Sequence, residues 1–138
     1  MKRSEAREQA FIIVFEKEFN MEASVDDIAS AAKDADVFEI DKFAKTLCEA
    51  VFADIESLDN IITENLRPGW RLSRISKVAI AILRMAICEM TKFDDVPVSV
   101  SINEAVELAK KYAPENDARF INGLLSTVAK KLKAEAEA

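Results

Sequence analysis

The side chains best suited to chemistry in this sequence are cations at its N-terminus, and the chemistry that they suit is phosphate binding. Arg3 and Arg7 stand four residues apart, so on a helix they project from the same side. A guanidinium group matches phosphate oxygens with two parallel hydrogen bonds, and Lys2 adds a further positive charge. The alternative is a solvated helix start, because Glu5 and Glu8 lie among these cations.

A second set lies near the C-terminus, where Arg119 and Phe120 are adjacent and Lys110 and Lys111 precede them. An aromatic ring beside cations can stack on an unpaired nucleobase while the cations bind the phosphates. Phe120 also fits the apolar stripe of the last helix, where it would be a core residue. The sequence leaves both interpretations open.

The pair Asn122-Gly123 follows directly and breaks a local rule. Asn-Gly is typical of a tight turn, but the apolar spacing continues through it, which predicts a helix. A glycine inside a helix costs about 1 kcal/mol relative to alanine, so something should require the missing side chain. Close helix packing and close approach of another backbone both fit.

No catalytic or metal-binding arrangement accompanies these residues. The chain has no histidine, the commonest general base and metal ligand, and its only cysteines, Cys48 and Cys88, are too few for a structural zinc site. We therefore expect no enzymatic activity, no metal and no cofactor. Both cysteines have apolar neighbours, which predicts buried reduced thiols, with a disulfide between them as the alternative.

The net charge of −6 argues against nucleic acid, but the distribution of charge does not. Residues 21–66 contain 12 acidic and 3 basic side chains, a net of −9, so the rest of the chain sums to +3. One part could repel phosphate while another attracts it, unless the charges only coat solvated faces. We find no signal peptide or membrane-spanning run, which indicates the cytoplasm.

The elements that must position these side chains are predicted to be helices. Two Gly and three Pro are few for an all-β fold, and no segment alternates with the period of a strand. We expect an all-α fold of six or seven helices in two packed bundles, divided at Arg67-Pro68-Gly69 into subdomains 1–66 and 67–138. The expected helices cover 4–19, 25–35, a longer stretch from 36 or 39 to 66, 78–90, 99 or 101 to 112, and 115–132, with residues 134–138 frayed.

Some individual roles follow from this pattern. Ser4 is a plausible N-cap of the first helix, and Ser101 with Glu104 has the spacing of a capping box. The helix at 78–90 is apolar almost all round, which predicts a central buried position. Trp70 is expected to plug the seam between the two halves rather than bind a ligand.

Several ordered blocks of residues carry a further signal: Trp70-x-Leu72-x-Arg74-Ile75, Ile82-Leu83-Arg84-Met85-Ala86-Ile87-x-Glu89-Met90, Asp95-Val96-Pro97, Ile102-Asn103-Glu104-Ala105-Val106-Glu107-Leu108-Ala109-Lys110 and Phe120-Ile121-Asn122-Gly123-Leu124-Leu125. With these blocks, the chain resembles the NusB family of transcription antitermination factors over nearly its whole length. The resemblance implies an all-helical fold of two bundles and no enzymatic activity. It also implies binding of the boxA element of nascent ribosomal RNA leaders together with NusE, which is ribosomal protein S-ten, within the RNA polymerase antitermination complex.

The resemblance also nominates RNA-binding residues. The family's basic first helix contacts RNA, which implies this role for Arg3 and Arg7, and the Phe of its Phe-(Val/Ile)-Asn-Gly block implies it for Phe120. Lys2 and Arg119 are added for their charge and proximity. Asn122 completes the expected site, where its side chain could face RNA or only tie the last helix to its neighbour.

Two departures from the family weaken parts of this expectation. Ser4 and Glu5 interrupt a cluster that is denser in arginine elsewhere, so binding of boxA should depend more on NusE. Acidic residues that some members use toward NusE are replaced here, near Ala79 and Asn116, so those contacts are not carried over. Family members occur as monomers or as homodimers that hide the RNA face, and the sequence leaves both open.

Two other functions stay open as alternatives. The chain could be a helical adaptor that binds only protein, with inert basic residues. It could also be the NusB-like module of an rRNA cytosine methyltransferase, although 138 residues leave no room for a nucleotide-binding α/β domain.

Overall fold

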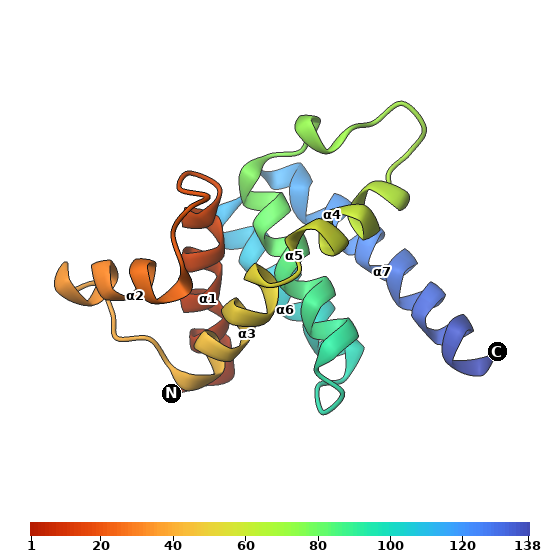
Figure 1. Ribbon diagram of the computed structural model, residues 1–138. Coiled ribbons are helices and arrows are strands. Elements are labelled where there is room, and N and C mark those ends of the chain that lie inside the picture. Colours follow the sequence, from red (N-terminus) through yellow and green to blue (C-terminus); the bar gives the residue numbers. More distant parts are fainter.

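The computed structural model describes all 138 residues and contains seven α-helices, one short 3₁₀ helix and no β-strand. The predicted all-α class is therefore confirmed, and Figure 1 shows how the helices pack together. None of the helices combines the length and apolar character needed to cross a membrane. The elements are α1 (Arg3–Lys17), α2 (Val25–Asp34), α3 (Lys42–Phe52), α4 (Ile55–Glu64), η1 (Leu72–Arg74), α5 (Lys77–Lys92), α6 (Val98–Tyr112) and α7 (Glu115–Glu137).

Side-chain caps explain where three of these helices begin. Ser24 accepts a hydrogen bond from the backbone N–H of Asp27, whose carboxylate accepts one from the Ser24 N–H, and this capping box starts α2. Asp41 caps α3 in a similar way. Ser76 accepts a hydrogen bond from the Ala79 N–H at the start of α5.

Three local predictions are wrong. The stretch predicted to run continuously to residue 66 is broken between α3 and α4, where Asp54 leaves the helical conformation with φ −140°. Ser4 is not a cap, because α1 already begins at Arg3, with the Lys2 carbonyl accepting from the Ala6 N–H. The C-terminal tail is helical to Glu137, since its alanine, glutamate and lysine residues are strong helix formers.

Helix α5 lies at the centre of the molecule, as its apolar pattern predicts (Figure 1). Every residue from Ala79 to Glu89 is buried, and α5 contacts α1, α3, α4, α6 and α7. The hydrophobic core is one continuous cluster that includes residues on both sides of the Pro68-Gly69 turn. The division into subdomains 1–66 and 67–138 stays a prediction.

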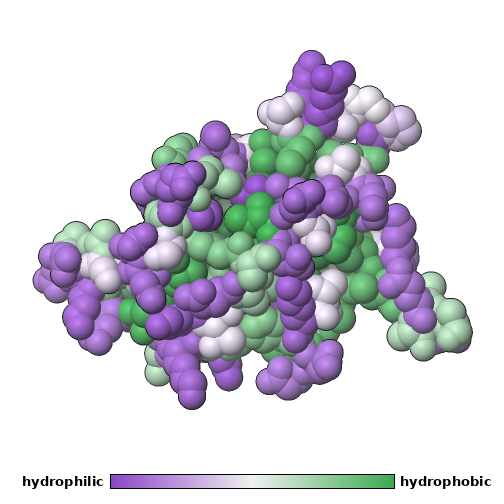
Figure 2. All heavy atoms as spheres, viewed as in Figure 1, coloured by the Kyte–Doolittle hydropathy of each residue, from purple (hydrophilic) through white to green (hydrophobic).

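The turn between α4 and α5 exposes a large aromatic residue. Trp70 is 54% exposed, so the prediction that it plugs a seam inside the molecule is wrong. The residue before it, Gly69, has φ +87° and adopts the left-handed conformation that glycine tolerates. Figure 2 shows hydrophilic side chains projecting over this face of the molecule, with hydrophobic residues visible between them.

Candidate nucleic-acid interface

Arg7 is the sequence-predicted site residue that the structure moves furthest from its expected place. Its side chain is buried, and Nε and Nη2 donate to the carboxylate of Glu89 on α5, with 2.6 Å between Nη2 and Oε1. Arg7 is therefore neither an exposed cation nor part of a solvated helix start, whereas Lys2, Arg3 and Glu5 before it are exposed. Both charges are neutralised within the core.

Ser101 completes this buried network and is not a helix cap. Helix α6 begins earlier than predicted, at Val98, so Ser101 lies within the helix and is only 2% exposed. Its hydroxyl donates to Glu89 Oε1 at 3.0 Å. Residues from α1, α5 and α6 therefore meet at one carboxylate, and the predicted capping box of Ser101 with Glu104 does not form.

The first turn of α1 keeps its other two cations at the surface. Lys2 and Arg3 are exposed, and no carboxylate lies within ion-pair distance of either. The Arg3 guanidinium carbon lies 4.0 Å from the centroid of the Phe43 ring, and that of Arg7 lies 5.3 Å from it. The two arginines thus project on the same side, as their spacing predicts, but only Arg3 faces solvent in a cavity of about 660 Å³ that Lys42 also lines.

Lys110 and Lys111, which precede Phe120 in sequence, are already paired. Lys111 Nζ lies 2.5 Å from Glu8 Oε1, and the Tyr112 hydroxyl donates to the same oxygen. The hydrogen bonds from Lys111 and Tyr112 hold the pKa of Glu8 below its ordinary value. Lys110 pairs with Glu107. These lysines carry less free charge toward a ligand than the sequence suggests.

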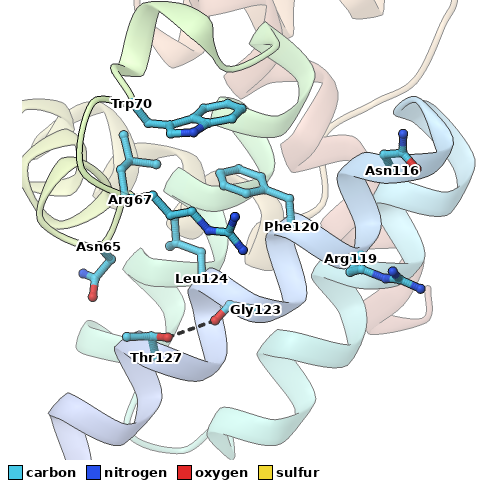
Figure 3. A pocket seen from close by; sticks show the side chains of 10 residues that line it. Asn65, Arg67, Trp70, Asn116, Arg119, Phe120, Gly123, Leu124 and Thr127 are labelled. Atoms are coloured by element: carbon cyan, nitrogen blue, oxygen red, sulfur yellow. Dashed lines mark hydrogen bonds between the residues drawn. The ribbon is translucent and has the colours of Figure 1, made fainter.

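Phe120 lines a surface groove with a volume of about 710 Å³. The groove lies between α7 and the turn that follows α4, and Figure 3 shows Trp70 and Arg67 entering it from that turn. The Phe120 ring is half-buried, with part of its surface packed against the core. Phe120 is thus partly a core residue, and the part of its ring that lines the groove keeps base stacking as a prediction. Arg119 is exposed, and in Figure 3 its guanidinium points away from the space between Trp70 and Phe120.

Asn122 and Gly123 lie within α7, which confirms the helix and excludes the tight turn. Both residues are exposed, and a Cβ added to Gly123 would meet no atom within 4 Å. Close packing against another helix of this chain therefore does not explain the glycine. Asn122 forms none of the side-chain hydrogen bonds of the structure, so it does not tie α7 to a neighbouring helix.

The exposed candidate residues thus form two separate sets. The cavity beside Arg3 and the groove beside Phe120 have no lining residue in common. Sequence reasoning missed Arg67 and Trp70, although the Pro-Gly turn was a signal for them. A turn places its neighbours at the surface, and exposed loops carry a disproportionate share of binding residues.

The structure contains neither a cluster of potential metal ligands nor an exposed cysteine. No cluster of three or more His, Cys, Asp or Glu side chains is placed to hold a metal ion. Cys48 and Cys88 are buried free thiols, as predicted. Burial raises the pKa of the Cys88 thiol to about 11 and raises that of Cys48 further, so neither is a reactive thiolate at neutral pH.

Comparison with known proteins identifies the family. The family model described as the NusB family matches residues 4–130, almost the whole chain. The chain belongs to the NusB family. Among NusB relatives, the transcription antitermination protein NusB of Acetivibrio thermocellus is 42% identical over 131 residues, covering 94% of this chain and 90% of the relative. That of Listeria welshimeri is 43% identical over 129 residues, covering 94% and 97%.

Solved structures of NusB proteins have the same fold as this chain. T. maritima NusB superposes with a TM-score of 0.76 at 30% identity, covering 94% of this chain and 92% of that one. A crystal structure of antitermination factors NusB and NusE in complex with dsRNA matches with a TM-score of 0.80 at 26% identity, covering 95% and 99%. The fold and family predicted from the sequence are confirmed.

Proposed function

We propose that this NusB family member is an RNA-binding transcription antitermination factor. It binds the boxA element of nascent ribosomal RNA leaders together with NusE, and the pair helps RNA polymerase to resist termination. The single observation that carries this proposal is the match, over 95% of the chain, to antitermination factors NusB and NusE in complex with dsRNA. The 42–43% identical relatives named for transcription antitermination support it.

The RNA contacts are assigned to exposed groups. Lys2 and Arg3 present unpaired positive charge to phosphates, and Phe120 offers an aromatic face beside Arg119 and Asn122.

Arg7 has a different role in this proposal from the one that the family resemblance implies. Because its guanidinium is neutralised by Glu89, Arg7 positions α1 and thereby the cations on the first turn of that helix. It does not need to touch RNA to affect RNA binding.

Binding, rather than catalysis, is the proposed activity. Among the carboxylates that line the cavities, Asp41 caps α3, and Glu8 and Glu107 pair with lysines, so these three do not form a site for acid–base chemistry. The factor would act with the RNA polymerase antitermination complex, and therefore in the cytoplasm where bacterial transcription takes place.

The test is a titration of labelled boxA RNA into the protein, with and without NusE, at several salt concentrations. We expect specific binding that is tighter with NusE, with an affinity that falls with salt by a slope of about 0.7 per single-stranded phosphate contact. A scrambled RNA of equal length is the control. Absence of specific binding under both conditions would contradict the proposal. If the affinity for NusE changes neither with RNA nor with reversal of the Arg3 charge, the protein is instead a protein-binding adaptor.

A further inference from the structure

The groove beside Phe120 contains more binding chemistry than that one ring. Trp70 is 54% exposed and faces the same cavity from the turn after α4, above the Phe120 ring in the view of Figure 3. Two aromatic side chains, from elements far apart in the sequence, thus border one open space. Its volume of about 710 Å³ lies within the range of about 300–1,000 Å³ typical of small-ligand pockets.

The charges around this space are of one sign. Arg67 and Arg119 line the groove, no acidic residue does, and neither arginine forms an ion pair within the protein. The Arg119 guanidinium points away from the two rings, so Arg67 is the cation nearest to them in Figure 3. In a chain with a net charge of −6, this arrangement marks a local site for an anion. In Figure 3 the Arg67 side chain reaches into the groove alongside Phe120.

Gly123 keeps the floor of the groove open. It lines the cavity on α7, and the space where its side chain would stand is empty within 4 Å. A ligand could therefore approach the α7 backbone closely at this point. This is the second of the two explanations that the sequence allowed for a glycine inside a helix.

We propose that Trp70 and Phe120 hold one unpaired nucleobase of single-stranded RNA, while Arg67 binds a phosphate next to it. This inference rests on the proposed RNA-binding function and adds to it a base-stacking site with two residues, Trp70 and Arg67, from the turn after α4. Stacking suits this groove because a nucleobase presents an aromatic face to both rings and its backbone presents negative charge to the arginine. A protein ligand would match the apolar rings, but the lack of any acidic lining residue favours a polyanion.

The protein contains its own reporter for this site. Trp70 is the only tryptophan of the chain, so the intrinsic tryptophan emission comes from the groove alone. Titration with a single-stranded boxA oligonucleotide should change this emission along the same curve as the anisotropy of the labelled RNA. Because Trp70 is exposed in the free protein, a ring that becomes covered by a base will report a different environment.

Substitutions separate stacking from charge. Trp70→Ala should weaken RNA binding about 5- to 150-fold, the range expected for the loss of one stacked base, with the salt slope unchanged. Trp70→Phe should restore most of the affinity. Arg67→Gln should weaken binding and lower the salt slope by about 0.7. Thermal unfolding of each variant should match the parent protein, because both side chains are exposed.

The outcomes distinguish this inference from the function on which it rests. If RNA binds but Trp70 emission stays constant and Trp70→Ala keeps full affinity, the stacking site is wrong and the RNA-binding function stands. If no RNA binds under any condition, the proposed function itself fails. If NusE without RNA changes the emission and RNA does not, the groove is a protein-docking surface and the inference is overturned.

Discussion

Arg7 and Glu89 are 82 positions apart in the sequence and form a buried salt bridge in which two guanidinium nitrogens donate to one carboxylate. The exposed fractions of the Arg7 and Glu89 side chains are 6% and 3%. The bridge joins α1 to the central helix α5, and the Ser101 hydroxyl brings α6 to the same carboxylate. The exposed cations Lys2 and Arg3 are thus carried by a helix whose position is set by a buried charge pair.

Removing one partner of this pair should be strongly destabilising. Glu89→Ala leaves the Arg7 guanidinium buried without a counter-charge, and we expect a loss of about 3–5 kcal/mol in the free energy of unfolding, measured by urea denaturation. The double replacement of Arg7 by Met and Glu89 by Leu should recover most of this loss, because no charge then stays buried. The exposed pair of Lys33 and Glu39 is a control, and Lys33→Ala should cost less than about 1 kcal/mol. If Glu89→Ala and Lys33→Ala lower the free energy of unfolding by similar amounts, the buried bridge does not stabilise the fold more than an exposed ion pair does.

Charge reversal should affect the two N-terminal arginines differently. Arg3→Glu changes an exposed side chain, so we expect weaker RNA binding and a smaller salt slope with unchanged unfolding. Arg7→Glu would place two carboxylates together in the core, so it should lower the midpoint of thermal unfolding. Parallel measurement of RNA affinity and unfolding for both variants checks this. An Arg7→Glu protein of normal stability that fails to bind RNA would instead indicate a direct RNA contact.

Gly123→Ala should separate stability from binding. Alanine is the better helix former, and its added methyl group meets no atom of this chain, so unfolding should become less favourable by about 0.5–1 kcal/mol. If RNA approaches α7 at this point, the same methyl group should weaken RNA binding. Differential scanning calorimetry and RNA titration measure the two effects. Glu135→Ala, an exposed substitution on α7 outside the groove, is the control, and it should leave RNA binding unchanged.

The contact of Glu8 with Lys111 and Tyr112 should make stability depend on pH in the acidic range. The pKa of Glu8 in the folded protein is below its ordinary value of 4.5, because Lys111 and Tyr112 donate hydrogen bonds to its charged form. The contribution of this contact is therefore present above about pH 4.5 and is lost as the pH falls through the lowered pKa. Urea unfolding of the parent and of Glu8→Gln between neutral and acidic pH should show a difference that shrinks as the pH falls. A constant difference would mean that Glu8 does not titrate with this contact.

Much of the fold follows from short-range signals in the sequence. Ser24 and Ser76 cap helices that start at the next residue, and Pro68 with Gly69 marks the turn between α4 and α5. The run from Ala79 to Glu89 is buried as its all-round apolar pattern predicts. These features depend on the backbone hydrogen bonds and burial of adjacent residues, so a local pattern is sufficient to find them.

The site was less predictable, because the surroundings of its residues come from distant parts of the chain. Ser101 and Glu104 have the spacing of a capping box, but the Ser101 hydroxyl donates to Glu89 instead. Arg7 was expected to project beside Arg3 toward a phosphate, but it is buried against Glu89. Trp70 was expected inside the molecule and is exposed. In each case the residue type was informative about its chemistry but not about its partner.

The sequence by itself determined the helices, their all-α packing and the family, because periodicity, caps and ordered motifs are written in neighbouring residues. Only the tertiary structure decided which cations are free. Arg3 and Arg7 lie on one side of one helix, and their difference arises because a carboxylate of α5 reaches Arg7 and none reaches Arg3. Whether a cation is available to a ligand depends on its burial and on the nearest opposite charge. Both are set by residues that are far apart in the sequence and close together in the fold.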